Sequence, residues 1–86
     1  MSRSDPELRE RIAETVRQRG IIRADSIVEL RHMLGEDAQS RSSISKAVRS
    51  LHYNQAYADK HVALYRPHTG DMETRPYHVS YTGSAG

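Results

Sequence analysis

The chain has 86 residues, a formal net charge of +2, and no Cys, Trp or Phe. This length allows one domain with a small core, and the lack of cysteine excludes disulfides and thiolate zinc sites. No apolar stretch approaches the roughly 20 residues of a membrane-spanning helix, and the first residues lack the apolar core of a signal peptide. We therefore expect a cytoplasmic protein, nucleoid-associated if prokaryotic, with no membrane partner.

Charge is unevenly distributed along the chain. Residues 1–40 contain seven arginines and eight acidic residues, whereas residues 41–86 contain six lysines or arginines and three acidic residues. No acidic residue occurs in residues 38–58, which include Arg41, Lys46 and Arg49. A local lack of negative charge beside serine hydroxyls favours contact with a polyanion.

The first half of the sequence predicts two helices with a short strand between them. Asp5-Pro6 is typical of a helix start and Gly20 of a helix end, so the first helix is expected over residues 6–19. Its inward positions recur at helical spacing and are Leu8, Ile12, Ala13 and Val16. Residues 21–23 are β-branched and then charged, which predicts a short edge strand.

A capping box of Ser26 and Glu29 predicts the start of a second helix, which runs to Gly35. Its apolar stripe consists of Ile27, Leu30, Met33 and Leu34. Residues 35–40 are polar and predict a turn.

A third helix is predicted over residues 41–53. Its inward side is formed by Ile44, Ala47, Val48 and Leu51. Asn54 is expected to end this helix in the left-handed conformation.

Two strands are predicted near the C-terminus from alternating apolar residues, over residues 62–66 and 77–81. The intervening residues 67–76 contain Thr69-Gly70-Asp71 and predict a broad hairpin loop. The expected domain spans residues 5–82, with flexible ends at 1–4 and 83–86.

The order helix, strand, helix, helix, strand, strand resembles the winged helix-turn-helix family over residues 5–82. The apolar framework that supports the resemblance is Ile27, Leu30, Leu34, Ile44, Val48 and Leu51. The resemblance implies an α+β fold, with three helices and a small antiparallel sheet that ends in a C-terminal hairpin wing. It also implies sequence-specific binding of double-stranded DNA, with the third helix in the major groove and the wing on the backbone or a minor groove.

The resemblance implies candidate contact residues at matching positions. On the third helix these are Arg41, Ser42, Ser43, Ser45, Lys46, Arg49 and Ser50, and on the wing they are Arg66, His68 and Arg75. We assign Ser42 and Ser43 to phosphate and capping contacts, and Lys46 and Arg49 to base edges or phosphates. The subfamily that reads left-handed duplexes carries Asn and Tyr where this chain has Ser45 and Arg49, so no subfamily is assigned.

Other residue classes give weaker signals. Four histidines lie in the C-terminal half, but their spacing matches no ligand motif, so we expect no metal and no other cofactor. The five tyrosines are expected to pack in the core, with Tyr53 and Tyr65 the most exposed. No nucleophile elbow or phosphate-binding loop is present, so we expect neither an enzyme nor a small-molecule substrate.

The sequence thus favours a transcriptional regulator that binds DNA as a homodimer, because one small module seldom gives enough specificity alone. Two alternatives stay open at this point. The domain could be a winged-helix module that binds another protein, or it could bind RNA.

Overall fold

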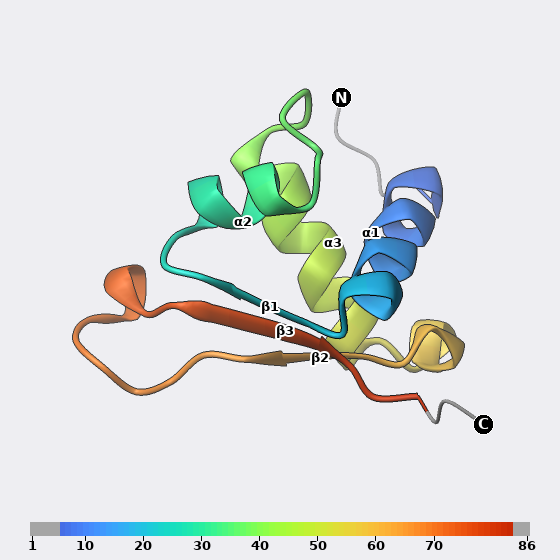
Figure 1. Cartoon of the computed structure of the whole chain (residues 1–86). Coiled ribbons are helices and arrows are strands. Elements are labelled where there is room, and N and C mark those ends of the chain that lie inside the picture. Colours follow the sequence, from blue (N-terminus) through green and yellow to red (C-terminus); the bar gives the residue numbers. More distant parts are fainter. Residues whose placement is uncertain (1–5, 84–86) are drawn as a thin grey trace.

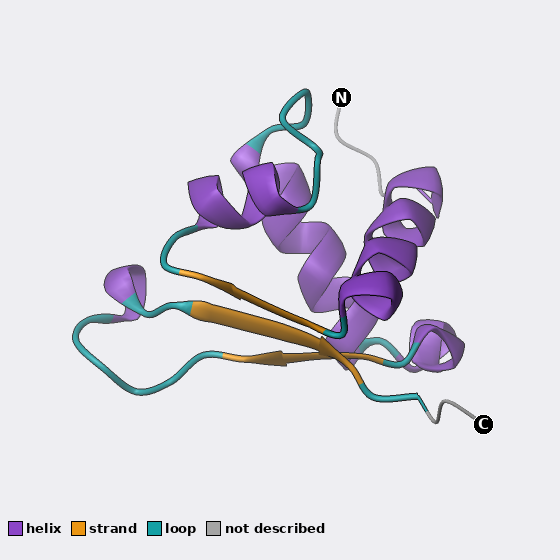
Figure 2. Cartoon of the chain, viewed as in Figure 1, coloured by secondary structure: helices purple, strands orange, loops and turns teal. Residues whose placement is uncertain are grey.

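The computed structural model describes residues 6–83, which form an α+β domain with helices on one face of a three-stranded antiparallel sheet (Figures 1 and 2). Apart from Gly83, the predicted flexible ends lie outside the described residues. The elements are α1 (Pro6–Arg19), β1 (Ile21–Ala24), α2 (Ile27–Met33), α3 (Arg41–Tyr53), β2 (Val62–Tyr65) and β3 (Tyr77–Tyr81), with the 3-10 helices η1 (Gln55–Lys60) and η2 (Met72–Thr74). None of the helices in this part of the chain is long and apolar enough to cross a bilayer.

The sheet has the strand order β1-β3-β2, so β1 and β2 are its edges. The predicted edge position of the first strand is therefore confirmed. In the register, Val79 of β3 lies opposite both Ile22 of β1 and Leu64 of β2. These three residues share the face that packs against the helices, and residues one position along each strand lie on the other face.

The core lies between the helices and the sheet. It includes the predicted inward positions of α1 and α3, and Leu30 and Leu34 are buried beside them. Ile27 and Met33 pack against this core but are only partly buried. Since α3 packs against α1, α2 and β2, its rotation about its own axis is fixed and one side must face outward.

The helix boundaries follow from local chemistry. Gly20 adopts a φ of +83° and donates its N–H to the Val16 carbonyl at 2.7 Å, which ends α1 as predicted. Ser26 caps α2, because its Oγ accepts the Glu29 N–H at 3.2 Å. The reciprocal half of the capping box is shifted, since the Glu29 carboxylate accepts the N–H of Asp25 at 2.6 Å.

The predicted end of α3 is wrong in its conformation. Asn54 is the C-cap, but its φ of −91° and ψ of 119° are extended and not left-handed. Its side-chain oxygen accepts the Ala56 N–H at 2.9 Å, so Asn54 caps the 3-10 helix η1 that follows directly. The left-handed residue is His61, with a φ of 57°, at the end of η1.

The loop between α2 and α3, residues 34–40, is tied to both preceding helices. Glu36 is buried and accepts two hydrogen bonds from the Arg11 guanidinium of α1, at 2.9 and 3.2 Å. Arg31 of α2 donates to the Gln39 carbonyl at 2.9 Å. These contacts position the first turn of α3 relative to the rest of the domain.

Candidate nucleic-acid interface

The first turn of α3 is capped by Ser40. Its Oγ accepts the Ser43 N–H at 3.1 Å and lies 3.0 Å from the Ser43 hydroxyl. Ser43 is therefore half-buried within the cap, whereas Ser42 is exposed. The capping role was predicted for Ser42 and Ser43, and the actual capping residue lies in the turn just before them.

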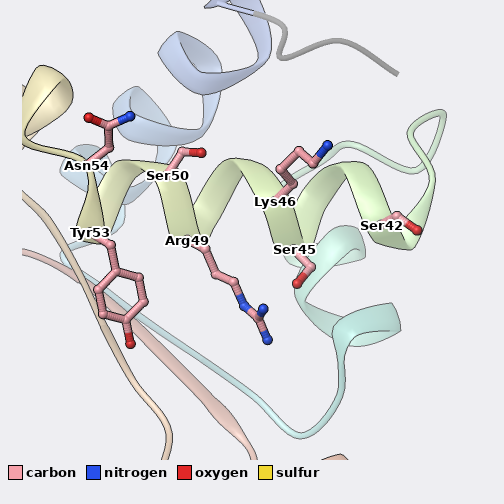
Figure 3. Close-up of a pocket in the computed structure, with 7 residues that line it drawn as sticks. All are labelled: Ser42, Ser45, Lys46, Arg49, Ser50, Tyr53 and Asn54. Atoms are coloured by element: carbon pink, nitrogen blue, oxygen red, sulfur yellow. The ribbon is translucent and has the colours of Figure 1, made fainter. Parts of the chain in front are cut away.

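The outward side of α3 presents four exposed side chains at helical spacing, namely Ser42, Lys46, Arg49 and Tyr53. They lie opposite the buried side of the helix, where Ile44 is fully enclosed. Figure 3 shows Arg49 and Tyr53 extending to one side of this face and Lys46 to the other. A groove runs along the face and is lined by Ser42, Ser45, Lys46, Arg49, Ser50, Tyr53 and Asn54.

The cations on α3 are left without partners inside the protein. Within residues 6–83, no hydrogen bond, ion pair or ring contact is made by the side chains of Arg41, Lys46 or Arg49. Some cations elsewhere are paired, since Arg11 pairs with Glu36 and Lys60 pairs with Glu10. The positive charge of α3 is thus available to an external anion.

Tyr53 and Asn54 line the groove but were not among the predicted site residues. Tyr53 is 71% exposed, which confirms its predicted exposure, and its ring makes an edge contact with His52 at 4.4 Å between centroids. The spacing of four residues from Arg49 to Tyr53 was the signal that could have identified it. An exposed tyrosine adds both a planar apolar surface and a hydroxyl to the face.

The candidate residues of the β2–β3 hairpin are arranged differently from those of α3. Arg66 is half-buried, and its guanidinium donates to the carbonyls of Met72 and Arg75 at 3.0 and 2.8 Å. It also lies 3.9 Å from the centroid of the Tyr77 ring. Arg66 is therefore engaged in holding the hairpin loop.

The two other hairpin candidates differ in exposure. Arg75 is half-buried and donates to the sulfur of Met72 at 3.2 Å, whereas His68 is exposed. Neither of them, nor Arg66, lines the groove on α3. The structure brings the α3 candidates together on one surface and leaves the hairpin candidates outside that groove.

The chemistry of the α3 face is that of an anion-binding surface. Guanidinium and ammonium groups donate to phosphate oxygens and to the acceptor edges of bases, and serine hydroxyls both donate and accept. In the described part of the chain, no three His, Asp or Glu side chains are placed to hold a metal ion. The side chains of the α3 face are therefore groups that bind an anion through charge and hydrogen bonds.

This chain matches no protein-family model, no curated protein and no solved structure. The α3 face is therefore the main indication of function in this chain.

Proposed function

We propose that this protein is a winged-helix transcriptional regulator that binds double-stranded DNA by inserting the outward face of α3 into the major groove. The observation that carries the proposal is the set of exposed α3 cations with no partner within residues 6–83, on a stretch of sequence without acidic residues. A helix fits the width of the B-form major groove, and unpaired cations are attracted by the phosphates on either side of it.

The positions on the helix suggest a division of roles. Arg49 lies in the middle of the groove-lining set, where a guanidinium can donate to both acceptors of a guanine edge. Arg41 and Ser42 lie in the first turn, where free backbone N–H groups add to the attraction for a phosphate. We assign Lys46 to a phosphate or a base edge.

A single helix of this length reads only a short stretch of sequence. Helix-turn-helix proteins commonly reach useful specificity by binding two half-sites about one helical turn apart as a symmetric dimer. We therefore propose that two copies bind a two-fold site. Selection of bound sequences from a random duplex pool tests this directly, because a dimer enriches a palindrome and a monomer enriches a single half-site.

The decisive test of the interface is the double variant Lys46→Ala with Arg49→Ala, measured by fluorescence anisotropy on a selected duplex. The loss of two charged contacts is expected to weaken binding at least tenfold, while the thermal unfolding temperature stays close to that of the wild type because both side chains are exposed. The matched control is Arg17→Gln with Lys60→Gln, which removes the same net charge from residues paired with Glu14 and Glu10.

Equal losses of duplex affinity in the two double variants would mean that binding depends on net charge alone. This result would overturn the assignment of the interface to α3. Binding of duplex RNA as tightly as duplex DNA of matched length would also contradict the proposal, because the A-form major groove is too narrow for a helix. Failure to bind any duplex would favour the protein-interaction alternative.

A further inference from the structure

The face of the sheet that points away from the helices carries a second group of side chains suited to nucleic acids. Along the register, Arg23 of β1, His78 of β3 and Tyr65 of β2 stand in one row across the three strands. With strands about 4.8 Å apart, this row spans roughly 10 Å from the first Cα to the last. Figures 1 and 2 show the helices on the opposite side of the sheet.

The two ends of the row are exposed to a ligand, and His78 between them is half-buried. Tyr65 is 60% exposed, and its ring lies against the His78 ring with 6.0 Å between centroids. Arg23 is exposed and makes no hydrogen bond or ion pair within residues 6–83. The rest of this outer face is small or apolar and contains no acidic residue, its members being Ile21, Ala63 and Ser80.

We propose that the outer face of the sheet binds single-stranded nucleic acid, with an unpaired base stacked on the Tyr65 ring and a neighbouring phosphate held by Arg23. An exposed aromatic ring stacks on any base because every base has a π face, and a nearby cation supplies the attraction for the backbone. The inference does not depend on the proposed binding of duplex DNA by α3, because the two sets share no residue.

The size and charge of the face favour this ligand over a second copy of the chain. The paired part of the sheet is three strands wide and four residues long, which at about 4.8 Å per strand and about 3.3 Å per residue gives roughly 200 Å². A stable protein interface needs about 800 Å² from each partner. Two copies meeting here would also bring together two arginines and no carboxylate from this face.

The test uses the full chain and a fluorescein-labelled thymidine 12-mer, which forms no duplex, measured by anisotropy at low salt. Tyr65→Ala is expected to weaken binding about tenfold and Arg23→Gln several-fold. Tyr65→Phe keeps the ring and is expected to bind like the wild type. The same three variants are expected to leave duplex binding unchanged.

The two proposals fail in distinguishable ways. Thymidine binding that is unaffected by Tyr65→Ala, or that is lost in the Lys46→Ala and Arg49→Ala double variant instead, overturns the sheet-face site. A change of oligomeric state in Tyr65→Ala, measured by sedimentation, assigns the face to self-association and also overturns it. Duplex binding that is unaffected by the α3 double variant contradicts the proposed function alone.

Discussion

At the scale of single residues, Arg66 shows how a predicted contact residue can serve the fold. Its guanidinium donates to two loop carbonyls and lies over the Tyr77 ring. Hydrogen bonds from a charged donor contribute about 1.5–3 kcal/mol each when they are desolvated, and less when solvent reaches them. The half-buried setting of Arg66 therefore predicts a structural contribution of intermediate size.

We expect Arg66→Gln to lower the free energy of unfolding by about 1–2 kcal/mol. Amide hydrogen exchange in the hairpin loop, residues 67–76, is expected to become faster in the same variant, because the loop loses its internal donor. Urea unfolding and exchange measured by NMR check the two effects. Arg23→Gln is the matched control, since it removes one exposed cation without a partner in the described chain. Equal exchange in the two variants would contradict this role.

At the scale of elements, the orientation of α3 depends on its first turn. Ser40 supplies the cap, and replacement of a capping serine by alanine typically costs about 1 kcal/mol. We expect Ser40→Ala to lower the thermal unfolding temperature and Ser42→Ala to leave it unchanged, because Ser42 is exposed and makes no capping contact. Calorimetry on both variants measures the two unfolding temperatures. A larger effect at Ser42 would show that the cap lies two residues later than observed.

The exposed side of α1 contributes to folding stability in a way that depends on pH. Hydrogen bonds from Arg17 and Gln18 lower the pKa of the Glu14 carboxyl below its ordinary value of 4.5. A lowered folded-state pKa adds stability above the unfolded pKa, and this stability is lost as the pH falls through the folded value.

We therefore expect Glu14→Gln to be slightly less stable than the wild type near neutral pH and equally stable in strong acid. Thermal unfolding followed by circular dichroism across this range provides the comparison. The effect is small because the pair is exposed to solvent. A difference between the two proteins that persists in strong acid would mean that Glu14 acts through something other than its charge.

Most elements could be predicted because their signals are local. The bounds of α1 were predicted since apolar spacing coincided with start and stop residues, and those of α3 from the polar turn before its apolar positions and Asn54 after them. The 3-10 helix η1 was missed because six residues without apolar periodicity carry no such signal. The role of Arg66 was missed for a different reason, since it depends on where a loop places its carbonyl oxygens. The α3 face was predictable in its charges, and Tyr53 was omitted although it continues their spacing.

At the scale of the whole molecule, unpaired positive charge is concentrated on α3. The exposed residues of α1 include three glutamates and three arginines, so their charges largely cancel, whereas the exposed residues of α3 include cations and no acid. A duplex approaching α1 would meet mixed charges, and one approaching α3 would meet unpaired positive charge. This asymmetry favours a single orientation of the domain on DNA, because unlike charges steer the encounter.

The concentration of unpaired cations on α3 predicts a salt dependence of DNA binding that belongs to this face. Each phosphate neutralised on B-form DNA adds about −0.9 to the slope of log affinity against log salt concentration. With Arg41 and Lys46 on phosphates and Arg49 on a guanine edge, the expected slope is about −1.8 for each copy bound, and the Lys46→Ala and Arg49→Ala double variant should fall to about −0.9. The Arg17→Gln and Lys60→Gln control should keep the wild-type slope, because its cations are already neutralised by Glu14 and Glu10. Anisotropy titrations at several salt concentrations measure all three slopes, and a control slope as shallow as that of the α3 variant would place the phosphate contacts elsewhere.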